Sequence, residues 1–145
     1  MLVGKRDFNT STMKNVKGFS IILKNKNIET MNVDFMKIKI DNLIDPFVYC
    51  DPPYILGTAA YNENNGWTEK DELKLLRYLK KLDEKGIPFA LSNVIEHKGM
   101  THQILKDWIE KNYFNIIYIK SNYSNSNYQL KDKDSVTREV LITNY

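Results

Sequence analysis

Cysteine and histidine are scarce in the chain, and their scarcity excludes two kinds of site. Cys50 is the only cysteine, so there is no internal disulfide and no zinc site built from several cysteines, and a reducing compartment fits. The two histidines, His97 and His102, lie near an expected helix start without a matching cluster of acids or cysteines. We therefore expect both to be surface residues, and we expect no metal site.

Long apolar runs are also missing. No stretch approaches the roughly 20 apolar residues that span a bilayer, and the first residues lack the basic, apolar and small-residue succession of a signal peptide. The composition, 42% hydrophobic and 27% charged, is typical of one soluble globular domain over residues 1–145. We therefore expect a cytoplasmic protein that makes no membrane contact.

The net charge of +3 is distributed unevenly. Residues 1–40 hold 8 Lys and Arg against 3 Asp and Glu, which leaves 13 against 15 for the remainder. A basic amino-terminal part suits a surface that meets nucleic acid, and an ordinary solvated surface explains it equally well.

Apolar spacing predicts three helices. One begins at Ser11 or Thr12 and is amphipathic. A second begins at Thr68, which forms a capping-box pattern with Asp71, and runs to Gly86. Its predicted apolar face consists of Leu73, Leu76, Leu79 and Leu82. The third begins near Thr101.

Apolar segments between these helices predict strands at residues 28–33, 46–50, 87–92, 114–120 and 138–145. Strands that alternate with helices imply right-handed crossovers and a parallel sheet, so we expect an α/β fold. The polar stretch at 121–137 offers no apolar face for a crossover helix. We therefore expect the last strand to pair antiparallel with 114–120 in a mostly parallel sheet.

The buried strand at 46–50 runs directly into Asp51-Pro52-Pro53-Tyr54. Ligands bind beyond the carboxyl ends of parallel strands, and the two prolines stiffen the turn and offer carbonyls without N–H donors. The Asp51 carboxylate and the Pro52 carbonyl beside the Tyr54 ring suit a planar base that carries an exocyclic amino group. Such acceptors favour attack by the amino nitrogen on an electrophilic methyl group without a metal. An ordinary strand-to-loop stop, with Tyr54 covering the core, fits the same residues.

Further motifs surround this tetrapeptide. "VYCDPPY" is followed by a loop with Tyr61, by "WTEKDELKLLRYLKKLDEKGIPFALSN" and by the closing "TREVLITNY". Together these resemble the Dam-like DNA adenine-N6 methyltransferases from about residue 28 to residue 145. The resemblance implies a partial Rossmann-like methyltransferase sheet with helices on both faces, the carboxyl-terminal part of a catalytic domain. Residues 1–10 would then be the tail of a DNA-recognition region.

The resemblance also implies roles for individual residues. Asp51 and the Pro52 carbonyl would hold the amino group of a flipped adenine, and Tyr54 would stack on it. Asp34, Phe35 and Asp51 would bind S-adenosylmethionine. Asp34, in "NVDF", would accept from a donor of its adenosine part and Phe35 would pack beside it, although Asp34 also fits a cap before "FMKIKI".

Other residues are candidates for DNA contacts. Tyr61 and Trp67 fall in the loop over the target pocket; for Trp67 we favour a role in packing at the helix start. Ser92 and Asn93 end a predicted strand on the same rim as Asp51 and would line the pocket or satisfy local backbone groups. The candidates for phosphate contacts are Ser121, Asn122, Ser124, Asn125, Lys131 and Lys133.

The chain departs from the family in its glycines. Family members carry a Phe-x-Gly-x-Gly loop near the methionine end of the cofactor, and no two of the chain's glycines are close enough to form one: Gly4, Gly18, Gly57, Gly66, Gly86 and Gly99. We therefore expect an amino-terminally truncated or split enzyme, inactive alone, that associates with itself or with a complementing amino-terminal chain. An RNA base amino-methyltransferase and a non-catalytic nucleic-acid-binding remnant are the alternatives.

Overall fold

The computed structural model describes residues 9–40, 43–56, 66–119 and 137–145. The chain divides into two compact units, residues 1–38 and 39–145, and each is described by itself. A single domain over the whole chain therefore stays a prediction. In the described part of the chain, no helix is both long enough and apolar enough to cross a membrane.

The first unit contains the predicted amphipathic helix. α1 spans Thr10–Lys24, and the Asn9 side chain caps it by accepting from the Thr12 amide at 2.9 Å. The predicted strand at 28–33 is wrong, because these residues join no sheet and their apolar side chains are exposed. A strand needs a partner for its backbone groups, and the described part of this unit offers none. A short 3₁₀ helix, η1 (Phe35–Lys37), follows.

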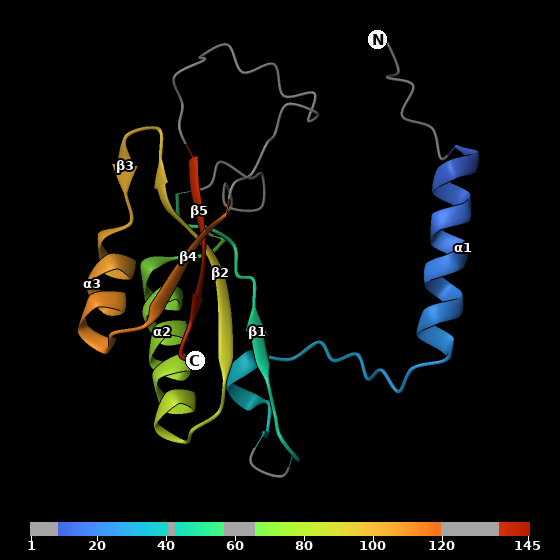
Figure 1. The fold of residues 1–145 in the computed structure, drawn as a ribbon, viewed down its shortest axis with the longest axis horizontal. Helices are drawn as coiled ribbons and strands as arrows, with labels where there is room; N and C mark the ends of the chain where they lie inside the picture. The colour runs from blue at the N-terminus through green and yellow to red at the C-terminus, as the bar shows by residue number, and fades with distance from the viewer. Residues whose placement is uncertain (1–8, 41–42, 57–65, 120–136) are drawn as a thin grey trace. The chain divides into compact units, whose positions relative to one another are not determined.

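The second unit is one mixed sheet covered by two helices (Figure 1). Its elements are β1 (Val48–Cys50), α2 (Glu69–Glu84), β2 (Phe89–His97), β3 (Met100–Thr101), α3 (Gln103–Asn112), β4 (Asn115–Ile119) and β5 (Thr137–Thr143). The strands lie in the order β1-β2-β5-β4, and β3 pairs with the end of β2.

The strand directions correct the expected mostly parallel sheet. β1 pairs parallel with β2, and β5 pairs antiparallel with both β2 and β4, as does β3 with β2. The prediction of an antiparallel last strand beside residues 114–120 is confirmed. However, β5 lies between β2 and β4. It therefore forms two antiparallel pairs, one with each of these strands, where the prediction had only the pair with residues 114–120.

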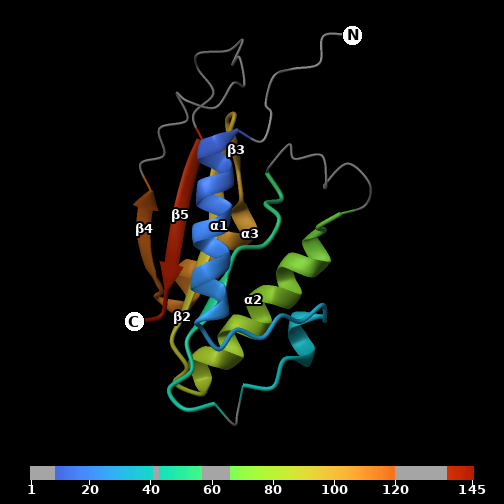
Figure 2. The same ribbon diagram turned by 90° about the vertical axis from the view of Figure 1, so that its right-hand side faces the viewer.

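Helices α2 and α3 cover one face of the sheet (Figures 1 and 2). Phe89 of β2 contacts the ring of Trp108 in α3, and Asn93 of the same strand bonds to Glu72 in α2. Residues 89 and 93 are separated by an even number of positions, so they point to the same face. A helix on the other face stays a prediction.

The core lies between this face and the helices. Phe89 packs edge-on against Phe114 at a centroid distance of 5.3 Å, and Trp108 lies 4.8 Å from Phe114. On α2 the buried residues are Glu72, Leu75, Leu76, Leu79 and Leu82. The predicted apolar face is therefore wrong by one position at its start, because Leu73 is 43% exposed.

The capping box at the start of α2 is confirmed. The Thr68 hydroxyl accepts from the Asp71 amide at 3.3 Å, and Asp71 Oδ2 accepts from the Thr68 amide at 3.0 Å. Two amide donors at the helix start are thereby satisfied, which fixes the first residue of α2.

Replacing Thr68 by Ala removes this cap and is expected to lower the free energy of unfolding by about 1 kcal/mol. Urea unfolding followed by circular dichroism measures the loss. Thr68→Ser keeps the hydroxyl and serves as the control, and an equal loss in both variants would contradict the assignment.

The lone cysteine lies next to a core residue in the sheet. Cys50 pairs in register with the fully buried Leu91, and burial raises the pKa of its thiol to about 11. At pH 8 we expect a disulfide reagent to react about a hundredfold more slowly with the folded chain than with the urea-unfolded chain, because the thiolate fraction falls tenfold per unit of pKa. Equal rates in both states would refute the burial of this thiol.

The same shift makes stability depend on pH. The pKa of the Cys50 thiol is higher in the folded chain than its ordinary value of 9.0. The neutral thiol therefore makes its full contribution to the free energy of unfolding below pH 9. The free energy of unfolding is then expected to fall as the pH rises from 9.0 towards about 11. Cys50→Ser should remove this part of the pH dependence.

Candidate active site

The site forms where β1 stops and β2 continues. Cys50 is the last residue of β1 and pairs with Leu91, so the following Asp51 lies beside Ser92. Pro52 and Pro53 have no N–H to donate to a sheet, and the chain leaves the ladder there. The strand end therefore delivers the tetrapeptide to a position next to a neighbouring strand whose backbone is still paired.

Ser92 and Asn93 do not end a strand, contrary to expectation. β2 continues to His97 because β5 pairs with it as far as Thr137. Successive residues of a strand point to opposite faces, so Ser92 and Asn93 separate. Ser92 faces the side opposite α2 and α3, whereas Asn93 is fully buried on the helix side.

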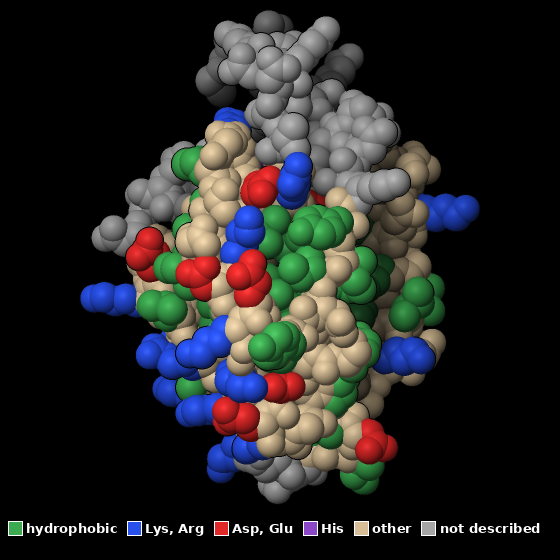
Figure 3. Space-filling view, turned by 60° about the vertical axis from the view of Figure 1, so that its left-hand side comes forward, with side chains coloured by type: hydrophobic (Ala, Val, Ile, Leu, Met, Phe, Trp, Pro, Cys, Tyr) green, Lys and Arg blue, Asp and Glu red, His purple; other side chains and the backbone are tan. Residues whose placement is uncertain are grey.

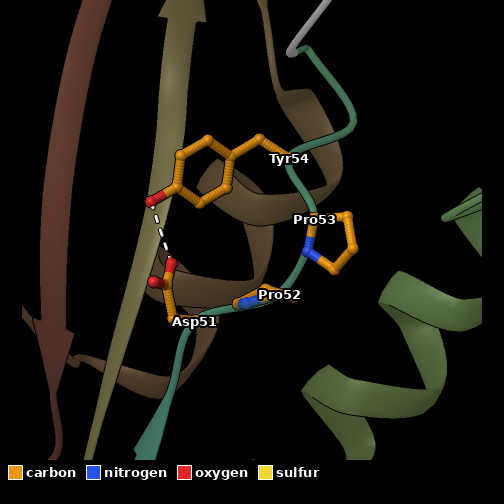
Figure 4. A pocket seen from close by; sticks show the side chains of 4 residues that line it. All are labelled: Asp51, Pro52, Pro53 and Tyr54. Atoms are coloured by element: carbon orange, nitrogen blue, oxygen red, sulfur yellow. Dashed lines mark hydrogen bonds between the residues drawn. The ribbon is translucent and has the colours of Figure 1, made fainter. Parts of the chain in front are cut away.

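A pocket of about 330 Å³ is lined by Asp51, Pro52, Pro53 and Tyr54 (Figure 4). Its volume is within the range of small-molecule sites. Figure 4 shows the Asp51 carboxylate and the Tyr54 ring turned towards each other, with both prolines along the turn between them. All four predicted catalytic residues are thus brought together at one place.

The polar groups of the pocket are hydrogen-bonded to one another. The Tyr54 hydroxyl donates to Asp51 Oδ1 at 3.0 Å and lies 3.1 Å from Ser92 Oγ. Burial raises the pKa of the Tyr54 hydroxyl; the Ser92 hydrogen bond opposes this effect, and the hydrogen bond to Asp51 adds to it. Tyr54 is therefore a neutral donor at neutral pH, and an amino group that approaches Asp51 Oδ1 meets an oxygen already hydrogen-bonded by a phenol.

Two neighbouring side chains have structural partners. Asn93 donates from Nδ2 to Glu72 Oε1 at 2.9 Å and accepts at Oδ1 from the Val94 amide. Trp67 donates from Nε1 to Glu72 Oε2 at 2.6 Å, at the start of α2. A direct DNA contact by Asn93 stays a prediction, and the hydrogen bond of Trp67 to Glu72 agrees with the packing role that we favour for it.

The expectation that both histidines lie at the surface is wrong for His102. Only 4% of this residue is exposed, and its Nδ1 accepts from the Leu105 amide as the cap of α3. A histidine side chain can accept a hydrogen bond from a backbone N–H at a helix start. The position of His102 just before Gln103 was therefore the feature from which a capping role could have been predicted. His97 is half-buried, and its Nδ1 lies 2.8 Å from Thr137 Oγ1.

Glu72 was not identified from the sequence. It is fully buried and lies beside Asn93, Trp67 and His102. Its position three and four residues before the buried Leu75 and Leu76 was the signal, because residues at that spacing share one face of a helix.

The predicted cofactor residues lie in the first unit. Asp34 accepts from the Met36 amide at 2.9 Å and caps η1, so the alternative of a local cap is confirmed. A carboxylate has two oxygens and can accept several hydrogen bonds, so this cap is compatible with a second donor. Phe35 is half-buried beside it.

The remaining candidates lie outside the described residues: Tyr61, Ser121, Asn122, Ser124, Asn125, Lys131 and Lys133. On the face that Figure 3 shows, the described Lys and Arg side chains are intermingled with Asp and Glu. That face does not present a continuous basic surface among the described residues.

Known proteins have sequences similar to this one. Residues 3–125 match the family described as D12 class N6 adenine-specific DNA methyltransferase. The chain is 38% identical to modification methylase StsI of Streptococcus sanguinis over 96% of its length, and 37% identical to type II methyltransferase M.FokI of Planomicrobium okeanokoites over 97%. It is also 31% identical to type II methyltransferase M1.LlaDCHI of Lactococcus lactis subsp. cremoris over 90%.

The chain spans 23% of StsI, 22% of M.FokI and 44% of M1.LlaDCHI. The matched residues include the whole pocket, and the predicted resemblance to DNA adenine-N6 methyltransferases is confirmed. The chain belongs to the family of D12 class N6 adenine-specific DNA methyltransferases.

Proposed function

We propose that the chain takes part in S-adenosylmethionine-dependent methylation of the exocyclic N6 of adenine in DNA, with Asp51 to Tyr54 as the site of the target base. The observation that carries this proposal is the pocket in which the Asp51 carboxylate lies beside Tyr54 and accepts from its hydroxyl. Family membership supports the reaction and the substrate class.

The proposed chemistry follows from the acceptors. The lone pair of an adenine amino nitrogen is delocalised into the ring, so the nitrogen is a poor nucleophile. The Asp51 carboxylate and the Pro52 carbonyl accept its two hydrogens and favour the tetrahedral geometry in which the lone pair can attack. S-adenosylmethionine, when bound, supplies the electrophilic methyl group.

The target base must leave the duplex to reach this pocket, since an amino group inside the helix is not accessible to Asp51. We propose that the flipped adenine stacks on Tyr54. Its amino group then displaces the Tyr54 hydroxyl from Asp51 Oδ1, and Ser92 Oγ, 3.1 Å from that hydroxyl, provides an alternative partner. Bases without an amino donor cannot make this exchange.

For the cofactor, we propose that Asp34 accepts a donor of the adenosine part and that Phe35 packs beside it. No two of the six glycines are close enough for the loop that approaches the methionine end in the family. We therefore propose that this chain acts together with a segment that supplies the loop, either in the same protein or in a partner chain.

An exposed apolar surface supports association. Tyr49 is 59% exposed and Ile117 is 53% exposed on the sheet face opposite α2 and α3, and β1 is an edge strand. Exposed apolar side chains on this face, and an edge strand that has no second partner among the described residues, favour contact with another chain.

Methyl transfer tests the function. With tritiated S-adenosylmethionine, the chain combined with a segment carrying the glycine loop is expected to label duplex DNA, and Asp51→Ala is expected to lower the rate by about a hundredfold or more. Glu84→Ala, an exposed carboxylate on α2, is the control that should leave the rate unchanged.

Two results of that experiment would reject the proposal. Labelling of RNA without labelling of DNA would assign the site to an RNA base methyltransferase. Absence of transfer to either, with DNA retained by the chain in a strongly salt-dependent way, would indicate a non-catalytic nucleic-acid-binding domain.

Sedimentation across a concentration series tests association. The isolated chain is expected to sediment increasingly as a larger species as its concentration rises, and Ile117→Lys is expected to oppose this by placing a charge on the open face. Lys81→Ala, on the exposed side of α2, is the control. A monomer at every concentration would contradict self-association and leave a complementing chain as the proposed partner.

A further inference from the structure

Glu72 is the one carboxylate among the described residues that is completely buried. It lies in the first turns of α2, on the helix face that also carries Leu75 and Leu76. A carboxylate in this position is costly unless donors surround it, and an apolar side chain would fill the same space at no such cost. The acid therefore calls for a role beyond packing.

The two carboxylate oxygens meet N–H groups from three separate segments. Oε2 accepts from Trp67 Nε1 at 2.6 Å, and Oε1 accepts from Asn93 Nδ2 at 2.9 Å. His102 Nε2 lies 3.3 Å from Oε1, at ion-pair distance but without hydrogen-bond geometry. Because His102 Nδ1 accepts from the Leu105 amide, the ring carries its proton on Nε2, which faces the carboxylate.

One of these partners, Asn93, connects Glu72 to the pocket. Asn93 is the neighbour of Ser92 in β2, and the two side chains point to opposite faces of the sheet, so Glu72 lies beneath the strand residue that contacts the Tyr54 hydroxyl. Trp67 lies just before the start of α2. The carboxylate thus joins the strand below the pocket to the residues that precede α2.

We propose that Glu72 is a positioning residue for the pocket: by holding Asn93 and Trp67 together it sets where Ser92, and through it the Tyr54 hydroxyl, stands relative to Asp51. A double acceptor is required for this role, since a single side chain must accept from two donors on different segments. The inference rests on the proposed function only in treating the pocket as the working site.

Glu72→Gln tests it with almost no change in volume. Whichever way the new amide is oriented, its NH₂ group faces a donor, either the Trp67 indole or the Asn93 amide, so one contact is lost. In the 145-residue chain without ligand, we expect the Trp67 indole proton to move upfield in the NMR spectrum and the Cζ resonance of Tyr54 to shift. Backbone amides at residues 67 and 93 should exchange with solvent about tenfold faster.

Asp83→Asn is the matched control. It makes the same chemical change in the same helix, at a carboxylate that bonds Lys80 and Asn144 rather than the pocket. In this variant the Cζ resonance of Tyr54 should not shift, even if the free energy of unfolding of the chain falls.

A shift of Tyr54 in Glu72→Gln but not in Asp83→Asn supports the inference. If Tyr54 stays in place while Trp67 moves, or if both variants shift Tyr54 equally, Glu72 has only a structural role. Should Glu72→Gln fail to fold, Trp67→Phe removes one donor and decides the matter, because its Tyr54 resonance must shift as well. These resonances are read without DNA or cofactor, so failure of methyl transfer leaves them interpretable.

Discussion

The missing N–H of proline is the constraint on which the site depends. β1 and β2 run parallel and in register up to Cys50, and Pro52 and Pro53 then have no N–H with which to continue the ladder. Beyond that point β2 stays in the sheet because β5 pairs with its other edge. As a result, a carboxylate and an aromatic ring leave the ladder beside a strand that is still paired.

The sheet separates two kinds of polar chemistry. On one face, the Tyr54 hydroxyl donates to the exposed carboxylate of Asp51 at the pocket and lies 3.1 Å from Ser92 Oγ. On the other face, the buried Glu72 and Asn93 are bonded to each other. The alternation of side chains along a single strand connects the two sets, so a change on the buried face reaches the pocket through one peptide unit.

Much of the fold followed from local rules. The Thr68–Asp71 capping box predicted the start of α2. The lack of an apolar face in residues 121–137 predicted the antiparallel pairing of β5 with β4. The pocket residues were also identifiable, because an acid and two prolines directly after an apolar strand leave little choice of structure.

Long-range contacts account for what was missed. The length of β2 depends on β5, which is 40 residues away where His97 meets Thr137. Similarly, the buried Glu72 resembles a surface acid until its donor at Asn93, 21 residues away, is known. The strand expected at 28–33 was wrong because a short segment with apolar residues forms a strand only when a neighbouring strand pairs with its backbone.

The position of β5 has a consequence for how the sheet assembles. β4 reaches the rest of the described sheet only through β5, so Asn115–Ile119 has no ladder partner there until Thr137–Thr143 has been synthesised and has closed the gap to β2. Assembly thus waits for a non-local pairing, which is the slow kind of folding step. A ribosome-bound chain that stops before residue 137 would hold β4 without a ladder partner among the described residues, so the synthesis of β5 decides when the described sheet becomes continuous.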